Sequence, residues 1–215
     1  MTSAIGRNKN DYFVTQAMTD ALRSASETGA LAALISRAVS AGKGMPPVER
    51  WNPPFCGDID MRIKADGTWF YMGTPIGRAP LVRLFSTVLR KDEDGKTYLL
   101  TPVEKVGITV EDAPFLAVEM AREGEDLTFR TNVGDVTIAG HNHPLRFEFD
   151  PDNHGLKPYV HIRGRLEALV SRPVMYELIS LGEEVLHEGK IWFAVRSGGV
   201  TFPIMEAAQL KELSL

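Results

Sequence analysis

The chain has 215 residues, of which 44% are hydrophobic and 24% charged, a composition typical of folded globular proteins and not of disordered or collagen-like chains. The 24 Lys and Arg residues against 28 Asp and Glu residues give a formal net charge of −4, so the overall charge does not favour binding to nucleic acid or to an anionic membrane. The single cysteine, Cys56, excludes an intrachain disulfide and a Cys-based zinc cluster, and it fits a protein of the reducing cytosol.

The N-terminal region, residues 1–45, is expected to be a polar arm followed by a helix. Its first twenty residues lack the apolar core of a signal peptide, and no stretch of the chain is long and apolar enough to span a bilayer, so we expect a cytoplasmic location. Apolar residues recur at helical spacing over residues 31–38, which predicts a helix that ends at Gly42 or Gly44. Prolines between residues 46 and 54 predict an extended linker after it.

The first domain is expected to span residues 46–112. Polar and apolar residues alternate from Asp58 to Lys64, which predicts a strand with one buried face. Asp66-Gly67 is a two-residue hairpin signal, and the aromatic segment after it predicts a return strand. The further elements are expected in this order: a helix over residues 78–90, a strand at 98–101 and a strand at 106–110.

The second domain is expected to span residues 113–215 and to be richer in strands. A helix is expected after Ser171, with Pro173 in its first turn and Val185 on its buried face. A short helix is expected at 206–213. The expected strands are at 114–120, 126–131, 135–139, 145–149, 159–166, 190–195 and 200–204.

The two domains share an order of elements that points to an internal duplication. A shift of 94 residues pairs Arg78 with Arg172 and continues without a gap as far as residue 98. Five residues are identical under this shift, namely Arg78, Leu84, Ser86, Gly95 and Lys96 with their counterparts. Because strand, helix, turn and strand follow in the same order in both halves, we expect an α+β fold of duplicated strand–helix–strand domains with mostly antiparallel sheets.

The first strand has a polar face that is a candidate functional site. The alternation places Asp58, Asp60 and Arg62 on one side, with neighbours roughly 6.5–7 Å apart. Two carboxylates at this distance can share a metal or divide acid and base roles. The alternative is a solvated strand face on which Asp and Arg cancel each other's charge.

Basic residues occupy the corresponding positions of the second half. His161, Arg163 and Arg165 share one side of the matching strand. If the two strand faces oppose each other, they form either a salt-bridged interface or an anion pocket between the domains. Arg78 and Arg172 stand at the starts of the two helices, where backbone N–H groups and the helix dipole also favour anions.

Histidines form a second candidate site. The spacing His141-x-His143, then Glu148 and Gly155, resembles the first metal motif of cupins, because two imidazoles and a carboxylate on one strand can face a transition metal. Pro144 and the glycine before the first histidine indicate a turn instead, and no Pro-x-Gly-x-x-His segment follows to supply the remaining ligand. A polar loop is the alternative interpretation.

The signatures of several enzyme classes are missing from the sequence. It contains no Gly-x-Gly-x-x-Gly or Walker phosphate loop and no Gly-x-Ser-x-Gly elbow, which disfavours the common nucleotide folds and the serine hydrolases. Cys56 has no candidate base nearby in the sequence, so we expect either a buried small residue or a redox-sensitive thiol.

Five longer segments carry a closer resemblance. They are PPFCGDIDMRI at 53–63, DGTWFYMGTPI at 66–76, LVRLFS at 81–86, TPVEKV at 101–106 and VEDAPF at 110–115. Together they resemble the bacterial family known as domain of unknown function 1285, over about residues 45–205. The resemblance implies a duplicated α+β architecture with a pleckstrin-homology-like C-terminal domain. It also implies a site for a nucleotide-like ligand between the domains and a role in signalling, and it supplies no catalytic residues.

We therefore predict a cytoplasmic binding protein that holds a small anionic, nucleotide-like ligand between its two domains, with no nucleic acid or membrane as partner. The residues expected to contact the charge of the ligand are Arg62, Arg78, Lys105 and Arg163. The residues expected to orient these cations, or to hydrogen-bond a ribose or base, are Asp58 and Asp60.

Two other classes of function stay open. The first is a metal-dependent enzyme, whose ligands would be Asp58, Asp60 and Glu104 or the pair His141 and His143. The second is a protein–protein adaptor, because pleckstrin-like barrels often dock peptides.

Overall fold

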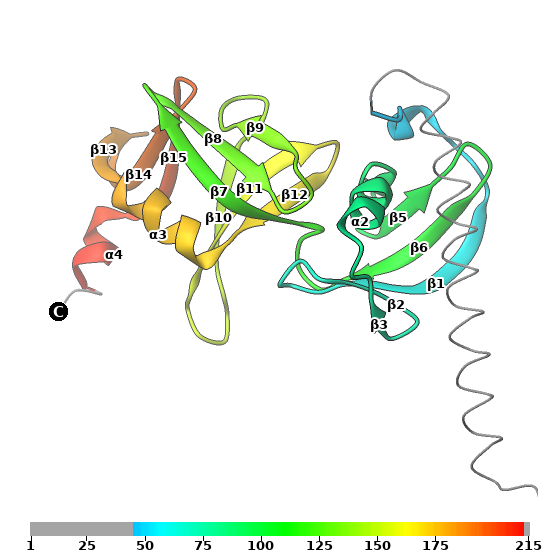
Figure 1. Ribbon diagram of the computed structural model, residues 1–215. Helices are drawn as coiled ribbons and strands as arrows, with labels where there is room; N and C mark the ends of the chain where they lie inside the picture. Colours follow the sequence, from blue (N-terminus) through cyan, green and yellow to red (C-terminus); the bar gives the residue numbers. More distant parts are fainter. Residues whose placement is uncertain (1–44, 213–215) are drawn as a thin grey trace, which may run out of the picture.

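The computed structural model describes residues 45–212 of the chain. These residues form two six-stranded sheets, one in each half of the chain, followed by a three-stranded sheet (Figure 1). The expected arm and helix before Met45 lie outside the described residues. Within residues 45–212, no helix is long and apolar enough to cross a membrane.

The first half begins with the strand that the sequence predicted most directly. In β1 (Phe55–Ile63) the side chains of Met61 and Ile63 are buried, whereas Asp60 and Arg62 are exposed. A turn at Gly67, where φ is +80°, returns the chain into the next strand. The other elements of this half are η1 (Val48–Arg50), β2 (Trp69–Tyr71), β3 (Thr74–Pro75), α2 (Ala79–Ser86), β4 (Leu89–Lys91), β5 (Thr97–Leu100) and β6 (Lys105–Val110).

The first sheet has the order β3-β2-β1-β6-β5-β4 and is mixed. Its one parallel pair joins β1 to β6, and all its other pairs are antiparallel. Helix α2 buries Phe85, whose ring stacks on Trp69 with the centroids 6.4 Å apart. The expected helix over 78–90 is too long, because the amide of Leu100 bonds to the carbonyl of Val88 and the next three residues form β4.

The second half is built around another mixed sheet, of order β10-β11-β12-β7-β8-β9. Its parallel pair joins β12 to β7. The single strand expected at 159–166 is two strands, because Gly164 adopts φ +53° and the chain folds back there. The strands of this sheet are β7 (Phe115–Glu123), β8 (Asp126–Thr131), β9 (Val136–Ile138), β10 (Leu145–Phe149), β11 (Leu156–Arg163) and β12 (Leu166–Val170).

A helix and a small antiparallel sheet complete the second half. Helix α3 (Arg172–Ser180) packs on β7, and a short C-terminal helix packs on the small sheet. Val185 is buried as expected, but it lies in a strand and not on the helix, which ends at Ser180. The remaining elements are β13 (Glu183–His187), β14 (Lys190–Ser197), β15 (Val200–Glu206) and α4 (Ala207–Glu212).

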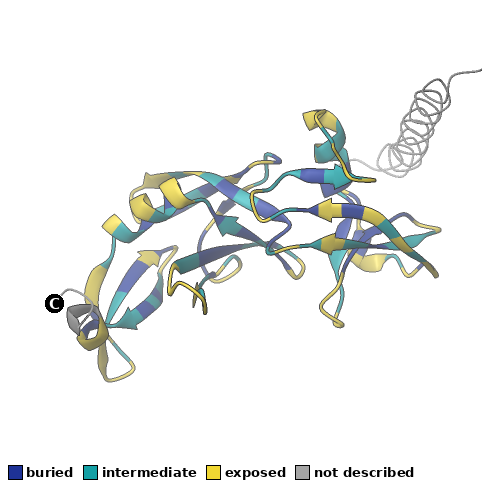
Figure 2. Ribbon diagram, turned by 90° about the horizontal axis from the view of Figure 1, so that it is seen from below, coloured by how far each residue is buried: buried dark blue, intermediate teal, exposed yellow. Residues whose placement is uncertain are grey.

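The duplicated organisation fits the structure. Each half contains a strand pair, a helix with Pro in its first turn and three further strands, in the same order along the chain. Helices are few, so the fold is rich in strands, and the sheets are mostly antiparallel as expected, with one parallel pair in each six-stranded sheet. The buried side chains of both halves belong to one connected core, in which Trp69, Phe85, Phe115 and Phe129 are the largest fully buried ones. Figure 2 shows buried residues along the ribbons of both halves.

Candidate functional site

A pocket of about 530 Å³ lies between the two halves of the chain. The first half contributes the turn after β1, part of β2 and the first turns of α2, and the second half contributes the end of β8 and the turn that follows it. Its lining residues are Gly67, Thr68, Trp69, Ile76, Gly77, Ala79, Pro80, Val82, Arg83, Arg130, Asn132, Val133 and Gly134. The pocket is therefore assembled only when both halves are folded.

One face of helix α2 forms a wall of this pocket. Ala79, Val82 and Arg83 are spaced i, i+3 and i+4, so they share one side of the helix. The amide of Ala79 is the first N–H of the helix and has no acceptor inside it. Together with the positive end of the helix dipole, this N–H favours a negatively charged group in the pocket.

The side chain of Arg83 reaches from α2 to the second half. Its guanidinium lies so close to Gly134 that a Cβ at that glycine would clash with it, and Gly134 also has φ +89°. Arg83 is exposed, and its guanidinium makes no hydrogen bond or ion pair with the residues that the structure describes. A guanidinium with free N–H groups is suited to a bidentate contact with a carboxylate or phosphate.

Two hydrogen bonds of the Asn132 side chain hold the opposite wall of the pocket. Asn132 accepts a hydrogen bond from the amide of Leu116 through Oδ1 at 3.1 Å and donates one from Nδ2 to the carbonyl of Gly67 at 3.3 Å. This amide therefore connects the β8–β9 turn to the β1–β2 turn of the other half. Arg130, the second arginine of the pocket, pairs with Glu119 on the neighbouring strand.

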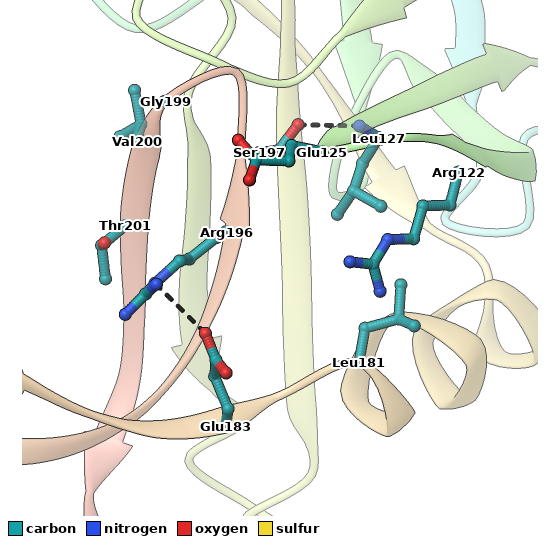
Figure 3. Close-up of a pocket in the computed structure, with 10 residues that line it drawn as sticks. All are labelled: Arg122, Glu125, Leu127, Leu181, Glu183, Arg196, Ser197, Gly199, Val200 and Thr201. Carbon is teal, nitrogen blue, oxygen red and sulfur yellow. Dashed lines mark hydrogen bonds and ion pairs between the residues drawn. The ribbon is translucent and has the colours of Figure 1, made fainter.

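Charge distinguishes this pocket from others in the described part of the chain. Its lining contains two arginines and no acid. A pocket of about 420 Å³ in the second half has two arginines and two glutamates, and there Arg196 lies 3.2 Å from Glu183 (Figure 3). Two smaller pockets, of about 370 and 300 Å³, contain more acids than bases. The interdomain pocket is the one with an excess of positive charge among these four.

Trp69 adds a buried donor to the wall. Its side chain is 1% exposed, and its indole Nε1–H has no acceptor among the described residues. Buried donors in folded proteins are normally satisfied, and this N–H is closed to solvent, so within residues 45–212 it is an unpaired donor in the wall and not at the pocket surface.

Two family models match the chain. The N-terminal domain of the domain of unknown function DUF1285 matches residues 46–113, and the C-terminal domain of the same family matches residues 114–204. The chain belongs to the DUF1285 family.

A solved DUF1285 structure agrees with this assignment, and a second is similar over part of the chain. A crystal structure of a family member from Silicibacter pomeroyi DSS-3 is 52% identical, covers 79% of this chain and 92% of its own, and has a TM-score of 0.72. A member from Shewanella baltica OS155 is 30% identical, covers 56% of this chain and 90% of its own, and has a TM-score of 0.47. No curated protein matches the sequence.

In this DUF1285 chain the predicted acidic residues of β1 lie on an exposed face. Asp58 packs over Gly107 of β6 and lines the 370 Å³ pocket, apart from the pocket between the halves. Asp60 is exposed, and Arg62 lies 3.6 Å from the carboxylate of Glu111. The expected strand face is therefore solvated, with its arginine next to an acid.

The predicted basic residues are mostly engaged by other groups. Arg163 donates to Asp135 at 2.6 Å and to the carbonyl of Ser86 at 2.7 Å. The second contact crosses between the halves, as does the ion pair of Arg165 with Glu93 at 2.7 Å. The partners of these arginines are not the acids of β1, so these contacts do not form the opposed strand faces that the sequence suggested.

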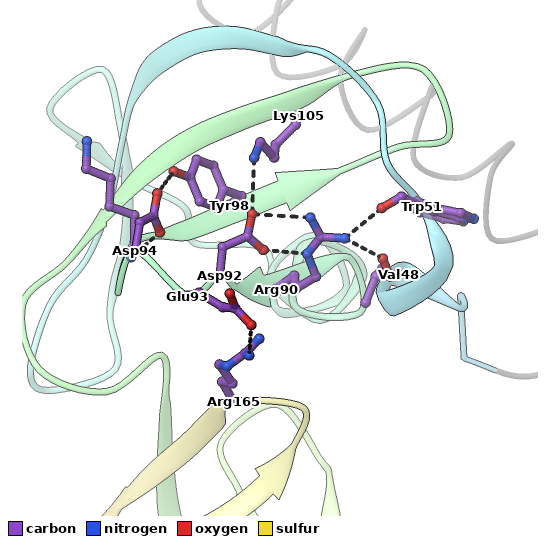
Figure 4. A network of polar contacts seen from close by, with 10 residues as sticks. Val48, Trp51, Arg90, Asp92, Glu93, Asp94, Tyr98, Lys105 and Arg165 are labelled. Atoms are coloured by element: carbon purple, nitrogen blue, oxygen red, sulfur yellow. Dashed lines mark hydrogen bonds and ion pairs between the residues drawn. The ribbon is translucent and has the colours of Figure 1, made fainter.

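Lys105 and its neighbours form a polar network in the first half (Figure 4). The ammonium of Lys105 lies 3.1 Å from Asp92, which also accepts from Arg90 at 2.6 Å. The Arg90 hydrogen bond holds the pKa of Asp92 below its usual value. Tyr98 donates to Asp94 at 2.5 Å, and this bond raises the pKa of Tyr98 to about 12. Lys105 is thus engaged within the domain by Asp92, which it shares with Arg90.

Arg78 is the sequence-predicted residue nearest to the pocket. It is the N-cap residue of α2, it is exposed, and it directly precedes the lining residue Ala79, but it does not itself line the pocket. The six predicted residues do not gather in one pocket. Arg83 was missed although it stands in the family-like segment 81–86, and the i, i+4 relation to Ala79 was the signal that could have found it.

The histidine segment adopts the turn that the sequence allowed as an alternative. Backbone hydrogen bonds join Gly140 and His143 in both directions, at 3.0 and 3.2 Å. The ring of His143 lies next to that of His161, with centroids 5.5 Å apart, and its Nδ1 is 3.2 Å from the carbonyl of that residue. Among the described residues, no three His, Cys, Asp or Glu side chains are grouped as a metal site.

Cys56 is an exposed thiol, so the expectation of a buried small residue was wrong. It precedes Gly57, which adopts φ +99°, at the start of β1, where the strand has not yet entered the core. Its Sγ lies 3.4 Å from the carbonyl of Pro54.

Proposed function

We propose that this DUF1285 protein binds a small anionic ligand in the pocket between its two halves. The observation that supports the proposal is Arg83, a guanidinium without an acidic partner in a pocket that has no acid in its lining. The first amide of α2 lies on the same helix face and adds a second donor for negative charge.

The rest of the pocket suits a ligand that also has an apolar body. Ile76, Pro80 and Val82, which are exposed or partly exposed, supply apolar surface. A nucleotide-like molecule combines a charged phosphate with a flat apolar base, which is the combination that these walls can receive. We propose this ligand class, together with a cytoplasmic signalling role, for the protein.

We also propose that the second half is pleckstrin-homology-like. The support is its strand-rich sheet with α3 packed on β7. A superposition of residues 114–204 on pleckstrin-homology domains tests this proposal, because a shared strand order and handedness would support it and a different connectivity would refute it.

The ligand proposal is tested by a thermal-shift screen of the full chain with nucleotides, cyclic nucleotides, other phosphorylated metabolites and carboxylates. A ligand at about a hundred times its dissociation constant stabilises the folded state by about 2.7 kcal/mol. The stabilisation should disappear in Arg83→Ala and persist in Arg78→Ala, the matched control whose arginine is exposed outside the pocket. Stabilisation by none of the anions, or equal stabilisation of both variants, would refute the proposal.

The same screen includes divalent metals, which address the enzyme alternative. Stabilisation by a metal that is lost in Asp60→Asn or His143→Ala would favour a metal-dependent enzyme at the face of β1 or at the histidine turn. Retention of the metal effect in both variants would remove these two candidate sites.

A second candidate function, a peptide-binding adaptor, is supported by the edge strand β9. Val136 and Ile138 are 64% and 48% exposed there, and an edge strand can pair with an extended peptide. Binding of apolar extended peptides that is lost in Ile138→Lys would support this function.

A further inference from the structure

The outermost strand of the small sheet, β13, has an unpaired edge. The sheet has the order β13-β14-β15, and within residues 45–212 no strand pairs with the outer side of β13. Figure 1 places this strand at the end of the molecule opposite to the first half, far from the pocket described above. Unpaired N–H and C=O groups on such an edge are a template for a further strand.

Apolar side chains stand beside this edge. Leu186 of β13 is 77% exposed, more than any other large hydrophobic side chain that the structure describes. In the sheet it lies opposite Ile191 of β14, which is 54% exposed. The two side chains form a small apolar surface next to the open edge, and burying it would be favourable.

The equivalent strand of the first half is protected. Under the 94-residue shift, β13 corresponds to β4, which is also the edge strand of its sheet, and Leu186 corresponds to Asp92. There Arg90 donates to the carbonyls of Val48 and Trp51, at 3.0 and 2.7 Å, so the segment around η1 lies against the strand. The first half thus protects this edge with charge and a covering segment, and the second half presents leucine instead.

We propose that β13 pairs antiparallel with β13 of a second copy of this chain, forming a continuous six-stranded sheet across a two-fold axis. Charge selects the register. Centring the pair on Val185 places Glu183 opposite His187 of the second copy, twice by symmetry. Centring it on Glu184 places that glutamate opposite itself, and centring it on Leu186 places Glu184 opposite Glu188. Both of these registers oppose like charges.

The structure leaves room for the Glu183–His187 contact. Arg196 approaches Glu183 at Oε1, 3.2 Å away, and a carboxylate accepts more than one hydrogen bond. In the Val185-centred register the buried faces of both sheets stay on one side, and the two Leu186 side chains become diagonal neighbours on the other. The interface therefore combines backbone pairing, two polar contacts and an apolar cluster.

The test is the mass of the full chain in solution by light scattering over a wide range of concentrations. We expect a concentration-dependent species of twice 23.8 kDa. Leu186→Glu, which faces Glu184 of the second copy in this register, and Glu183→Lys should be monomeric, and the double variant Glu183→Lys/His187→Glu should dimerise again, because it again places a carboxylate opposite a hydrogen-bond donor across the axis. Circular dichroism confirms that each variant is folded.

The matched control is Ile138→Lys on the edge strand β9, which should dimerise like the wild type. A wild-type chain that is monomeric at all concentrations would overturn the proposal, and so would a dimer that persists in Leu186→Glu and Glu183→Lys. Loss of the dimer in Ile138→Lys alone would place the contact on β9 and overturn it as well. None of these residues lines the interdomain pocket, so the outcome is independent of the proposed ligand.

Discussion

The two halves of this chain share one order of elements but have diverged in what they expose. In the first half, α2 presents Arg83 to the pocket between the halves; in the second half, the equivalent position of α3 is Glu177, which is exposed and lines no pocket described above. The helix starts differ too, because Arg172 contacts the hydroxyl of Tyr176 at 3.3 Å, whereas Arg78 stands next to the pocket. The two halves therefore share a scaffold but differ in charge at equivalent helix positions.

The sheets diverged in the same way. In the first half β6 returns to pair with β1, so all six strands form one sheet. Within residues 45–212, β15 of the second half pairs only with β14, and the parallel pair of this half joins β12 to β7. The last three strands of the second half are therefore a separate sheet with its own open edge.

The largest expected effect concerns the buried faces of the two helices. Leu178 of α3 is fully buried, whereas its counterpart Leu84 of α2 is only partly buried. Leu178→Ala should lower the free energy of unfolding by about 2–5 kcal/mol, because it leaves a cavity in the core. Leu84→Ala should cost clearly less. Urea denaturation measures both, and equal costs would show that the helices pack equivalently after all.

Removing Arg90 should have the next largest effect. This side chain is 11% exposed and holds Asp92 and two backbone carbonyls, all of which lose a donor in Arg90→Ala. We expect a loss of about 1–3 kcal/mol in chemical denaturation. The control is Arg196→Ala, which removes an exposed pair in the second half and should cost about 0–1 kcal/mol. A larger loss of stability in Arg196→Ala than in Arg90→Ala would contradict the account that β4 is the better protected sheet edge.

A pH dependence should come from Tyr98. Its hydrogen bond to Asp94 raises its pKa from 10.0 to about 12, so the folded state holds this proton more tightly than the unfolded state. The stabilisation is complete below pH 10.0 and is lost as the pH rises through this interval to about 12. Tyr98→Phe should flatten this part of the stability curve. The counterpart in the second half is Trp192, which does not titrate, so Trp192→Phe should leave the alkaline slope unchanged.

The smallest effect is expected between the halves. Arg165 and Glu93 form an ion pair whose side chains are 53% and 86% exposed, so Arg165→Ala should change stability by only about 0–1 kcal/mol. A larger change in the thermal midpoint would show that this contact fixes the halves relative to each other. The comparison is Asn132→Ala, which removes the hydrogen bonds from the Asn132 side chain to Leu116 and to Gly67 of the other half.

Local patterns predicted the elements whose signals are local. The alternation in β1 and the turn at Gly67 were visible in the sequence, and β10 coincides with its expected range. The end of α2 could not be predicted from the sequence, because Val88 and Leu89 continue its apolar stripe. Both are buried, as they would also be in a longer helix. Their place in a strand depends on pairing with β5, which lies further along the chain.

The candidate site was harder to predict for the same reason. Alternation correctly placed Asp60 and Arg62 on one exposed face, but no periodicity shows what that face will meet. Arg163 was expected at an anion site, yet Asp135 and the carbonyl of Ser86 engage it, and both contacts arise only from tertiary packing. Arg83 became a candidate because it lines a pocket that residues of the other half complete, among them Gly134, which lies against its guanidinium.

The most direct test of the anion site exchanges the charges of the two equivalent helix positions. Arg83→Glu gives the first helix the residue of the second, and Glu177→Arg does the reverse. With the best anion from the thermal-shift screen, titration calorimetry should detect binding to the wild type and to Glu177→Arg, and none to Arg83→Glu. Undiminished binding to Arg83→Glu would contradict the assignment of the interdomain pocket as the ligand site.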